Sequence, residues 1–413
     1  MRVRKIHLAW ALVALALVVR IGFVRHFWTH PHPASILDSD GYTILAASVV
    51  ERGEYALDKG IPSLDRPPLF PLFIAFFYLL VGVKPLIVLW LNTVLSTATC
   101  GMAYLLGRRL FSERAGLLAL AFWAVYPYSI YYCGWAIREC FISLLVAIML
   151  WCLLDWLEEP TFKRGAACGV VGGLIALTNP VALIFLGGAP FVFGLLIKRF
   201  RDAWKSVAVY FVVLGVLYSP WIIRNQITFG VPIVTNIHGG KQFFQGMLVP
   251  AEAFGTPEET RILETDPDYA HGTELMNAHK WVEANKWFNQ SAWKWLFAHP
   301  LKYASIVAHR VIKLWRLVPY ERVYSHDYRK IWWASALSDG LVIPLGLMGI
   351  VALRERWREL LPLYSLLAFW TTAYVLVFVV MRFRMPAMMA MILFAAAFID
   401  KTLFSGRREP LHG

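Results

Sequence analysis

Residues 67–82 read PPLFPLFIAFFYLLVG, an apolar run of 16 residues that opens with two prolines. Ten other apolar runs come near the length at which a helix crosses about 30 Å of hydrocarbon. These runs cover residues 7–27, 86–107, 115–133, 140–157, 165–181, 182–198, 204–222, 334–353, 359–381 and 385–403. Whether residues 67–82 also cross decides on which side of a membrane every later loop lies.

The composition points to a membrane protein. Of the 413 residues, 58% are hydrophobic and only 16% are charged, and the mean hydropathy is +0.55. Soluble proteins carry about 25% charged residues, so the chain does not resemble an ordinary cytosolic enzyme. The apolar content also excludes a disordered chain.

Basic residues favour one topology. If residues 67–82 do not cross, the cytoplasmic segments hold 18 Lys and Arg residues and the short outer loops hold seven. If they do cross, the later loops exchange sides and this bias largely inverts. Since Lys and Arg accumulate in cytoplasmic loops, we predict an all-helical protein with ten spans and both termini in the cytoplasm. Residues 67–82 then form a re-entrant or interfacial helix on the outer side.

The same topology accounts for the net charge of +13, so no nucleic-acid partner is expected. The first run follows MRVRK and lacks an A-x-A cleavage pattern, which is typical of a retained anchor. None of the five cysteines forms a CxxC pair, and we expect buried thiols without a disulfide or a metal.

The predicted topology divides the chain into three parts. Residues 1–222 form a transmembrane module whose first outer loop is 28–85, residues 223–333 form a long outer segment, and residues 334–413 form the last spans. Within the long segment, 279–319 is rich in tryptophan and basic residues, as expected of a helix at the head-group level. Residues 250–272 are polar, with Pro and Gly, and are predicted to form a loop.

Acidic side chains gather on the predicted outer side. Asp38 and Asp40 follow the first span in DSDGY, Asp65 precedes the prolines, and Glu139 opens a span. A structural role is the alternative for each: DSDGY could cap a helix, and Glu139 could face a helix N-terminus or be neutralised by Arg138. Ionisable groups near a membrane are costly and usually functional.

Basic side chains also lie on this side, against the positive-inside trend. They are Arg66, Arg224, Lys241, Arg382 and Arg384. A bound phosphate would explain them, because Arg offers a bidentate fork to phosphate oxygens. Snorkelling to lipid head groups is the alternative. His238 and Lys241 flank Gly239 and Gly240, where a ligand could approach the backbone closely.

Five stretches together resemble GT-C fold glycosyltransferases of the bacterial group similar to protein O-mannosyltransferases and the lipid A aminoarabinose transferase (glycosyltransferase family 39-like). They are DSDGYTILAASVVERGEY (38–55), LDRPPLFPLFIAFFYLLVG (64–82), YLLGRRLFSERAGLLALAFWAVYP (104–127), LYSPWIIRNQITFGVPIVTNIHGG (217–240) and RFRMPAMMAMILFAAA (382–397). The chain departs from the family at ALTNP, where Asn179 replaces a residue that is commonly basic.

The resemblance implies an enzyme that moves a sugar from a polyprenyl-phosphate donor to a lipid, glycan or protein acceptor. The site would lie on the periplasmic or extracytoplasmic face of the inner membrane. Asp38 matches the family's catalytic acid, and we take it as the base, with Asp40 in reserve. Glu139 orients its neighbours, binds the acceptor or holds a cation. We expect donor-phosphate binding by Arg66, Arg382, Arg384, Lys241 and Arg224, and substrate contacts from Tyr42, Asp65 and His238.

The sequence leaves two questions open. Asp38, Asp40 and Glu139 could hold Mg²⁺ or Mn²⁺, but arginines can replace a metal at a monophosphate, so no cofactor is expected to be obligatory. A lipid transporter or flippase is the rival function, and a non-catalytic glycolipid-binding scaffold is a third. A transporter would place charges near the bilayer midplane, often in paired repeats, whereas the acids here cluster at span ends.

Overall fold

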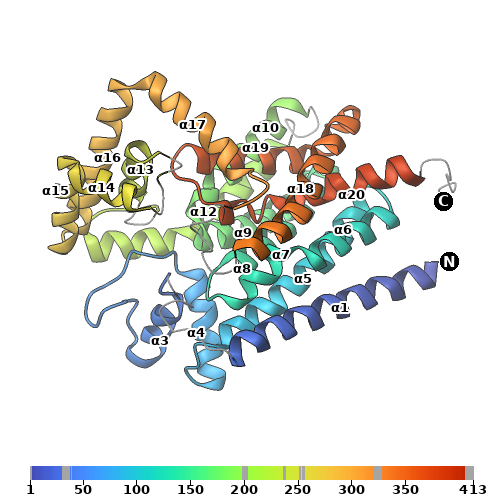
Figure 1. Ribbon diagram of the computed structural model, residues 1–413, viewed down its shortest axis with the longest axis horizontal. Coiled ribbons are helices and arrows are strands. Elements are labelled where there is room, and N and C mark those ends of the chain that lie inside the picture. Colours follow the sequence, from blue (N-terminus) through green and yellow to red (C-terminus); the bar gives the residue numbers. More distant parts are fainter. Residues whose placement is uncertain are drawn as a thin grey trace.

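The computed structural model describes residues 2–29, 38, 40–197, 203–235, 239–250, 253, 256–319 and 328–404, and these ranges are almost entirely helical (Figure 1). Within them no strand is formed, only an isolated bridge between Ala56 and Pro62. The longer helices are α1 (Arg2–Thr29), α5 (Ile87–Leu110), α8 (Glu139–Glu158), α9 (Phe162–Thr178), α12 (Trp204–Phe229), α18 (Tyr328–Ala352) and α20 (Met388–Phe404). The shorter helices are α3 (Tyr42–Arg52), α4 (Leu69–Val81), α6 (Glu113–Val125), α7 (Pro127–Tyr131), α10 (Leu183–Leu196), α13 (Gly239–Leu248), α14 (Pro257–Thr265), α15 (Pro267–Asn277), α16 (Trp281–Ala298), α17 (Pro300–Leu314) and α19 (Leu361–Val375). The described ranges also contain four 3₁₀ turns: η1 (Tyr132–Gly134), η2 (Pro180–Ala182), η4 (Arg354–Arg356) and η5 (Met381–Arg384).

Each of the ten predicted spans contains a helix. Five helices in the described ranges are long and apolar enough to cross a membrane: Ile6–His26 within α1, and α5, α8, α12 and α18. The pair Glu113–Val125 and Pro127–Gly134 passes the same test together, although it is bent by 54°. Leu69–Val81, Pro180–Leu196 and Leu361–Val375 are apolar but shorter. The count of ten spans therefore stays a prediction.

Proline interrupts the helices near the middle of the chain. Tyr126 precedes Pro127 and adopts an extended backbone (ψ 115°), and Asn179 precedes Pro180 with ψ 89°. A residue before proline is pushed out of the α region by the ring. At the second break, the side-chain amide of Asn179 donates a hydrogen bond to the hydroxyl of Tyr374 (2.6 Å).

A buried arginine joins α1 to the rest of the bundle. Arg20 is fully buried and donates hydrogen bonds to the hydroxyls of Ser96 (2.8 Å) and Ser129 (2.7 Å). Its guanidinium also reaches the carbonyls of Ala124 (3.0 Å) and Trp123 (3.1 Å). Every arm of the cation has a partner, so its burial at membrane depth is compensated.

The two ends of the bundle differ. At one end, the hydroxyl of Ser112 donates to Asp400 (2.6 Å), and Lys401 donates to the carbonyl of Ala352 (2.8 Å). The start of α1 and the end of α20 lie at this end, and α13 to α17 lie at the opposite end (Figure 1). This agrees with a topology in which both ends of the described chain share one side.

The long outer segment folds into helices with a small core of their own. Phe244, Met247, Ala284, Phe288 and Ala292 are buried together there. The prediction of a loop over residues 250–272 is wrong, because α14 and α15 fill most of it. Pro257 and Pro267 occupy first-turn positions, where proline favours a helix start, and Asp266 caps α15 by accepting from the Tyr269 N–H (2.8 Å).

Candidate active site

A cavity of about 590 Å³ opens between the first outer loop, the break after α9, the helices of the outer segment and the connection from α19 to α20. Its polar lining comes from three arginines, one aspartate, three tyrosines and the Asn179 amide, among others. Its apolar side is largely aromatic. The residues used below are Asp40, Tyr42, Arg66, Arg138, Asn179, Phe243, Trp293, Leu296, Tyr303, Tyr374, Leu376, Phe378, Arg382 and Phe383.

Asp40 sits between two arginines. Nη2 of Arg66 lies 3.1 Å from Oδ1 of Asp40, and Nη2 of Arg382 lies 3.2 Å from Oδ2. Arg66 also donates from Nε to the Asp40 carbonyl (2.8 Å). Burial opposes ionisation, but the guanidinium groups of Arg382, Arg66 and Arg138 outweigh it and lower the pKa of Asp40. Asp40 is therefore ionised at neutral pH.

Arg382 links Asp40 to a second acid. Its Nε lies 3.5 Å from Oε1 of Glu139, which is 4% exposed at the first turn of α8. The other oxygen of Glu139, Oε2, is buried and has no hydrogen-bond partner among the described residues. Buried acceptors are normally paired, so this oxygen is suited to a group that the substrate brings.

Asp38 has a different environment, although it is only two residues away. Its carboxylate accepts from the N–H groups of Tyr42 (2.9 Å) and Thr43 (2.7 Å) and from the Thr43 hydroxyl (2.6 Å). These contacts cap α3. Burial raises the pKa of Asp38 despite these hydrogen bonds. Asp38 does not line the cavity, whereas Asp40 does.

Gly41 makes this division possible. Its φ of 74° lies in the left-handed region, and a Cβ there would come within 2.8 Å of Cδ2 of Leu57. The turn lets Asp38 point back at the helix start while Asp40 faces the cavity. Within the motif DSDGY, Asp38 thus takes the capping role, and Asp40 lines the cavity.

The other predicted site residues divide into two groups. Tyr42 lines the cavity, with Arg66 over its ring at 5.8 Å. Asp65 accepts from the Ser63 hydroxyl (2.6 Å) and is not part of the cavity lining. Lys241 lies 5.5 Å from the ring of Tyr269, also outside this lining, and burial lowers its pKa.

Two predicted phosphate-binding arginines are held elsewhere. Arg384 is 2% exposed and pairs with Asp339 of α18 instead of entering the cavity. Arg224 donates to the Ser63 carbonyl (2.9 Å) and packs over the ring of Trp221. His238 lies outside the described residues.

Two residues that line the cavity, Arg138 and Asn179, are not among the residues predicted from the sequence to contact a substrate. Arg138 was considered only as a neutraliser of Glu139, yet it lines the cavity and donates to the Thr178 carbonyl (3.1 Å). Asn179 was noted only as a departure from the family. It is 2% exposed, its amide N–H donates to the Tyr374 hydroxyl (2.6 Å), and its Oδ1 has no partner among the described residues. The signal that could have found both was their position beside a helix break.

A metal site is not evident in the described part of the chain. No group of three or more His, Cys, Asp or Glu side chains is placed there to hold an ion. Asp40 and Glu139 share the guanidinium of Arg382, so a cation bound by both would have to displace it.

A family model and several solved structures relate the chain to known proteins. Residues 65–223 match the family model for dolichyl-phosphate-mannose-protein mannosyltransferase. Among curated proteins, no sequence matches the chain. The matched range contains Arg66, Arg138, Glu139 and Asn179, but not Asp38, Asp40 or Arg382.

Solved structures share the fold. The Archaeoglobus fulgidus oligosaccharyltransferase AglB, in complex with an inhibitory peptide and a dolichol-phosphate, matches with TM-score 0.56 and 14% identity, covering 98% of this chain and 52% of that one. The same enzyme complexed with Zn and sulfate gives TM-score 0.53 and 13% identity, covering 95% and 49%. ArnT from Cupriavidus metallidurans, bound to undecaprenyl phosphate, gives TM-score 0.46 and 16% identity, covering 97% and 81%.

The chain has the fold of the GT-C membrane glycosyltransferases, and it spans about half the length of the AglB chains. Residues 65–223 are in addition similar to a family of transferases whose name refers to a sugar carried on a lipid phosphate. The resemblance predicted from the five sequence stretches is confirmed.

Proposed function

We propose that this protein transfers a sugar from a polyprenyl-phosphate donor to a hydroxyl or amine of an acceptor, by a single displacement that inverts the anomeric centre. The acceptor is a lipid, a glycan or a protein. Transfer takes place on the extracytoplasmic face of the inner membrane, with both termini in the cytoplasm. Three predicted cytoplasmic loops meet in the structure, because Arg356 donates to the Leu110 carbonyl and both Arg109 and Arg164 contact Asp155. This grouping of basic residues supports the proposed orientation.

The observation that carries the proposal is the charge of the cavity and its surroundings. Three guanidinium groups, of Arg66, Arg138 and Arg382, face two carboxylates, of Asp40 and Glu139. One positive charge is in excess, which suits a phosphate monoanion held between arginine forks. The aromatic and aliphatic side of the cavity, including Phe243, Trp293, Leu296, Leu376 and Phe378, suits the adjoining prenyl chain.

Different residues of the cavity carry out different parts of the proposed reaction. The acceptor oxygen or nitrogen forms a bond to the anomeric carbon while the bond from that carbon to the phosphate oxygen breaks. Arg382 and Arg66 stabilise the negative charge that develops on the leaving phosphate. The acceptor proton passes to a carboxylate, which we assign to Asp40 because Asp40 lines the cavity and Asp38 caps α3. Such a base contributes about 10²- to 10⁴-fold.

We expect transfer without added Mg²⁺ or Mn²⁺. The guanidinium between Asp40 and Glu139 supplies the positive charge that a divalent cation would supply at that position. AglB was solved with Zn and sulfate, so transfer by this chain should be compared with and without EDTA. Full activity in EDTA would support the arginine-based site, and abolition that Mg²⁺ or Mn²⁺ reverses would contradict it.

The deciding experiment uses a panel of radiolabelled polyprenyl-phosphate sugars with the purified full chain. We expect wild type to release polyprenyl phosphate from one donor and Asp40→Asn to lose this release. Asp58→Asn is the matched control, since Asp58 is an exposed acid in the same loop. Retained release in Asp40→Asn with loss in Asp38→Asn would return the base to Asp38. Tight donor binding and lipid translocation without release would favour the transporter.

A further inference from the structure

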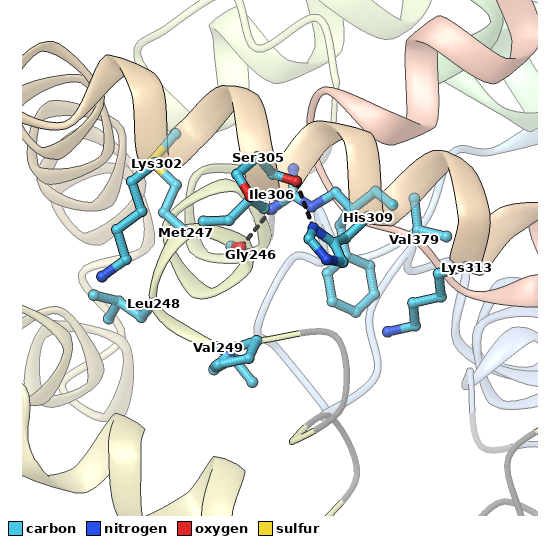
Figure 2. Close-up of a pocket in the computed structure, with 13 residues that line it drawn as sticks. Gly246, Met247, Leu248, Val249, Lys302, Ser305, Ile306, His309, Lys313 and Val379 are labelled. Carbon is cyan, nitrogen blue, oxygen red and sulfur yellow. Dashed lines mark hydrogen bonds between the residues drawn. The ribbon is translucent and has the colours of Figure 1, made fainter.

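A second cavity, of about 290 Å³, lies beside α17 and the end of α13 (Figure 2). One wall is a face of α17, and the other is the end of α13 with the residues that follow it. Phe378 lines both cavities, whereas every other lining residue belongs to one of them. The smaller cavity is therefore a separate site that shares a wall with the proposed catalytic one.

The face of α17 that lines this cavity is strongly basic. Lys302, His309, Arg310 and Lys313 recur at helical spacing and line the same side. Figure 2 shows the side chains of Lys302, His309 and Lys313 leaving α17 on the side of Leu248 and Val249. The described lining contains no Asp or Glu. Several cations in one concave site form an attractive potential for an anion.

The basic residues have different tasks. Arg310 is 5% exposed and donates to the Val375 carbonyl (3.0 Å) and to the Gly246 carbonyl, so it holds the two walls together. His309 is exposed, and its Nδ1 donates to the Ser305 carbonyl (2.8 Å), which fixes the ring and leaves Nε2 for another partner. Lys302 is exposed at the cavity rim, with its ammonium 5.5 Å from the Trp295 ring.

Exposed apolar side chains flank the basic face of α17 and continue onto the end of α16. Phe297 is 75% exposed, Leu301 is 86% exposed and Ile312 is 68% exposed. A helix with an apolar face and a basic face lies at the boundary between acyl chains and head groups. In that position α17 would bring its basic cavity to the depth at which lipid phosphates lie.

We propose that this second cavity binds the phosphate-bearing head group of an anionic membrane lipid. Lys302 and His309 contact the phosphate oxygens, and Lys313 adds positive charge to the lining of the cavity. The acyl chains follow the exposed apolar side chains of α17. Lysine ammonium groups form charge-assisted hydrogen bonds to phosphate, and an imidazole nitrogen can add a further hydrogen bond. The proposal concerns lipid binding alone and does not depend on glycosyl transfer.

The test measures binding of dihexanoyl phosphatidylglycerol and dihexanoyl phosphatidylcholine to the full chain in detergent, by native mass spectrometry. We expect phosphatidylglycerol to bind wild type, and its Kd to rise by about tenfold or more in Lys302→Gln/His309→Gln, since each charge-assisted hydrogen bond is worth about a factor of ten. Lys280→Gln/His271→Gln makes the same chemical changes at exposed positions outside the cavity and should bind as wild type does.

Three results would overturn the proposal: equal phosphatidylglycerol binding by wild type and the cavity variant, equal binding of the zwitterionic lipid, or an equal loss in the control variant. Displacement of phosphatidylglycerol by an equal concentration of inorganic phosphate would assign the cavity to a free anion and reject the lipid. If the double variant does not fold, as judged by its melting temperature, Lys302→Gln alone provides the comparison, because that side chain is exposed.

Discussion

Nη2 of Arg384 donates a hydrogen bond to Oδ2 of Asp339, and the two side chains are 3% and 0% exposed. Tyr126 donates to the other oxygen of Asp339 (2.8 Å). Arg384 also donates through Nη1 to the Leu314 carbonyl (3.0 Å). This buried network fixes η5, the turn from which Arg382 reaches Asp40.

Replacement of Asp339 should therefore damage both stability and catalysis. In Asp339→Asn the Arg384 cation stays buried without its counter-charge, which costs about 3–5 kcal/mol. We expect a lower melting temperature and, in the folded fraction, a lower kcat for transfer because Arg382 loses its support. Asp155→Asn is the control, because it breaks a partly exposed pair with Arg109, worth about 0–1 kcal/mol. An unchanged melting temperature in Asp339→Asn would contradict the role of this pair.

Arg382→Lys should retain the charge and lose the bridge. A lysine has one ammonium group and cannot contact Asp40 and Glu139 in the way that the fork of arginine does. We expect transfer to fall by about 10²- to 10³-fold, the loss seen when one preorganised donor to a developing anion is removed. Arg52→Lys, at a pair near the surface with Glu54, is the comparison. Equal rates for both variants would remove Arg382 from the reaction.

Asn179 should affect sugar recognition. The Oδ1 of Asn179 has no hydrogen-bond partner among the described residues, and we expect it to accept from a sugar hydroxyl in the cavity. Asn179→Ala removes that acceptor, and we expect KM for the donor to rise by about tenfold and selectivity between donors to relax. Tyr374→Phe, which removes only the partner of the amide N–H, should have a smaller effect. Identical donor selectivity in Asn179→Ala and wild type would exclude this role.

Asp38 and Asp40 should give opposite pH dependence of stability. Burial favours neutral Asp40, but three guanidinium groups, first that of Arg382, outweigh it and lower the pKa. Its stabilising effect is present above the unfolded pKa of 3.8 and is lost as the pH falls through the folded value. Burial raises the pKa of Asp38, so its effect is greatest below 3.8 and is lost as the pH rises through the folded value.

Melting temperatures of wild type, Asp40→Asn and Asp38→Asn from about pH 3 to about pH 6 test this difference. The advantage of wild type over Asp40→Asn should grow as the pH rises. Its advantage over Asp38→Asn should decline over the same range, because asparagine keeps an acceptor for the cap of α3 and has no charge to bury. Parallel curves for the two variants would contradict the assignment of different environments.

Gly349 allows α18 to approach α20 closely. A Cβ at this position would meet the carbonyl oxygen of Phe394, whereas a Cβ at Gly340 of the same helix has nothing within 4 Å. Gly349→Ala should lower stability by about 1–3 kcal/mol, and Gly340→Ala should leave it unchanged or raise it slightly. The measurement is thermal unfolding in detergent followed by tryptophan fluorescence. Equal melting temperatures would show that the helices can separate without cost.

The helical regions could be predicted well from the sequence, because the length of an apolar run indicates where a helix forms and how long it is. Their interruptions were harder to predict. The run at 115–133 contains a bend at Pro127, and the polar stretch 250–272 hides two helices whose starts are set by Pro257 and Pro267. Proline favours a turn in one context and a first helical turn in another, and only the packing of the outer segment decides between them.

Several residues of the candidate site could be named from the sequence, but the contacts that each of them makes could not. Asp38 and Asp40 are nearly equivalent in the sequence, and the left-handed Gly41 separates them in space. The partner that distinguishes Asp40 is Arg382, 342 positions away. Arg384 matched the same motif as Arg382, but its counter-ion Asp339 lies inside an apolar run and gave no signal of a buried pair.

The hydrogen bonds from Arg384 to the end of α17 also affect how such a protein can change during evolution. Nη1 of Arg384 holds the carbonyls of Leu314 and Arg316, so the outer helices are fastened to the turn that carries Arg382. The outer segment is thus not an exchangeable module. A chimera that imports another protein's outer segment would need to import a matching turn at residues 381–384 as well.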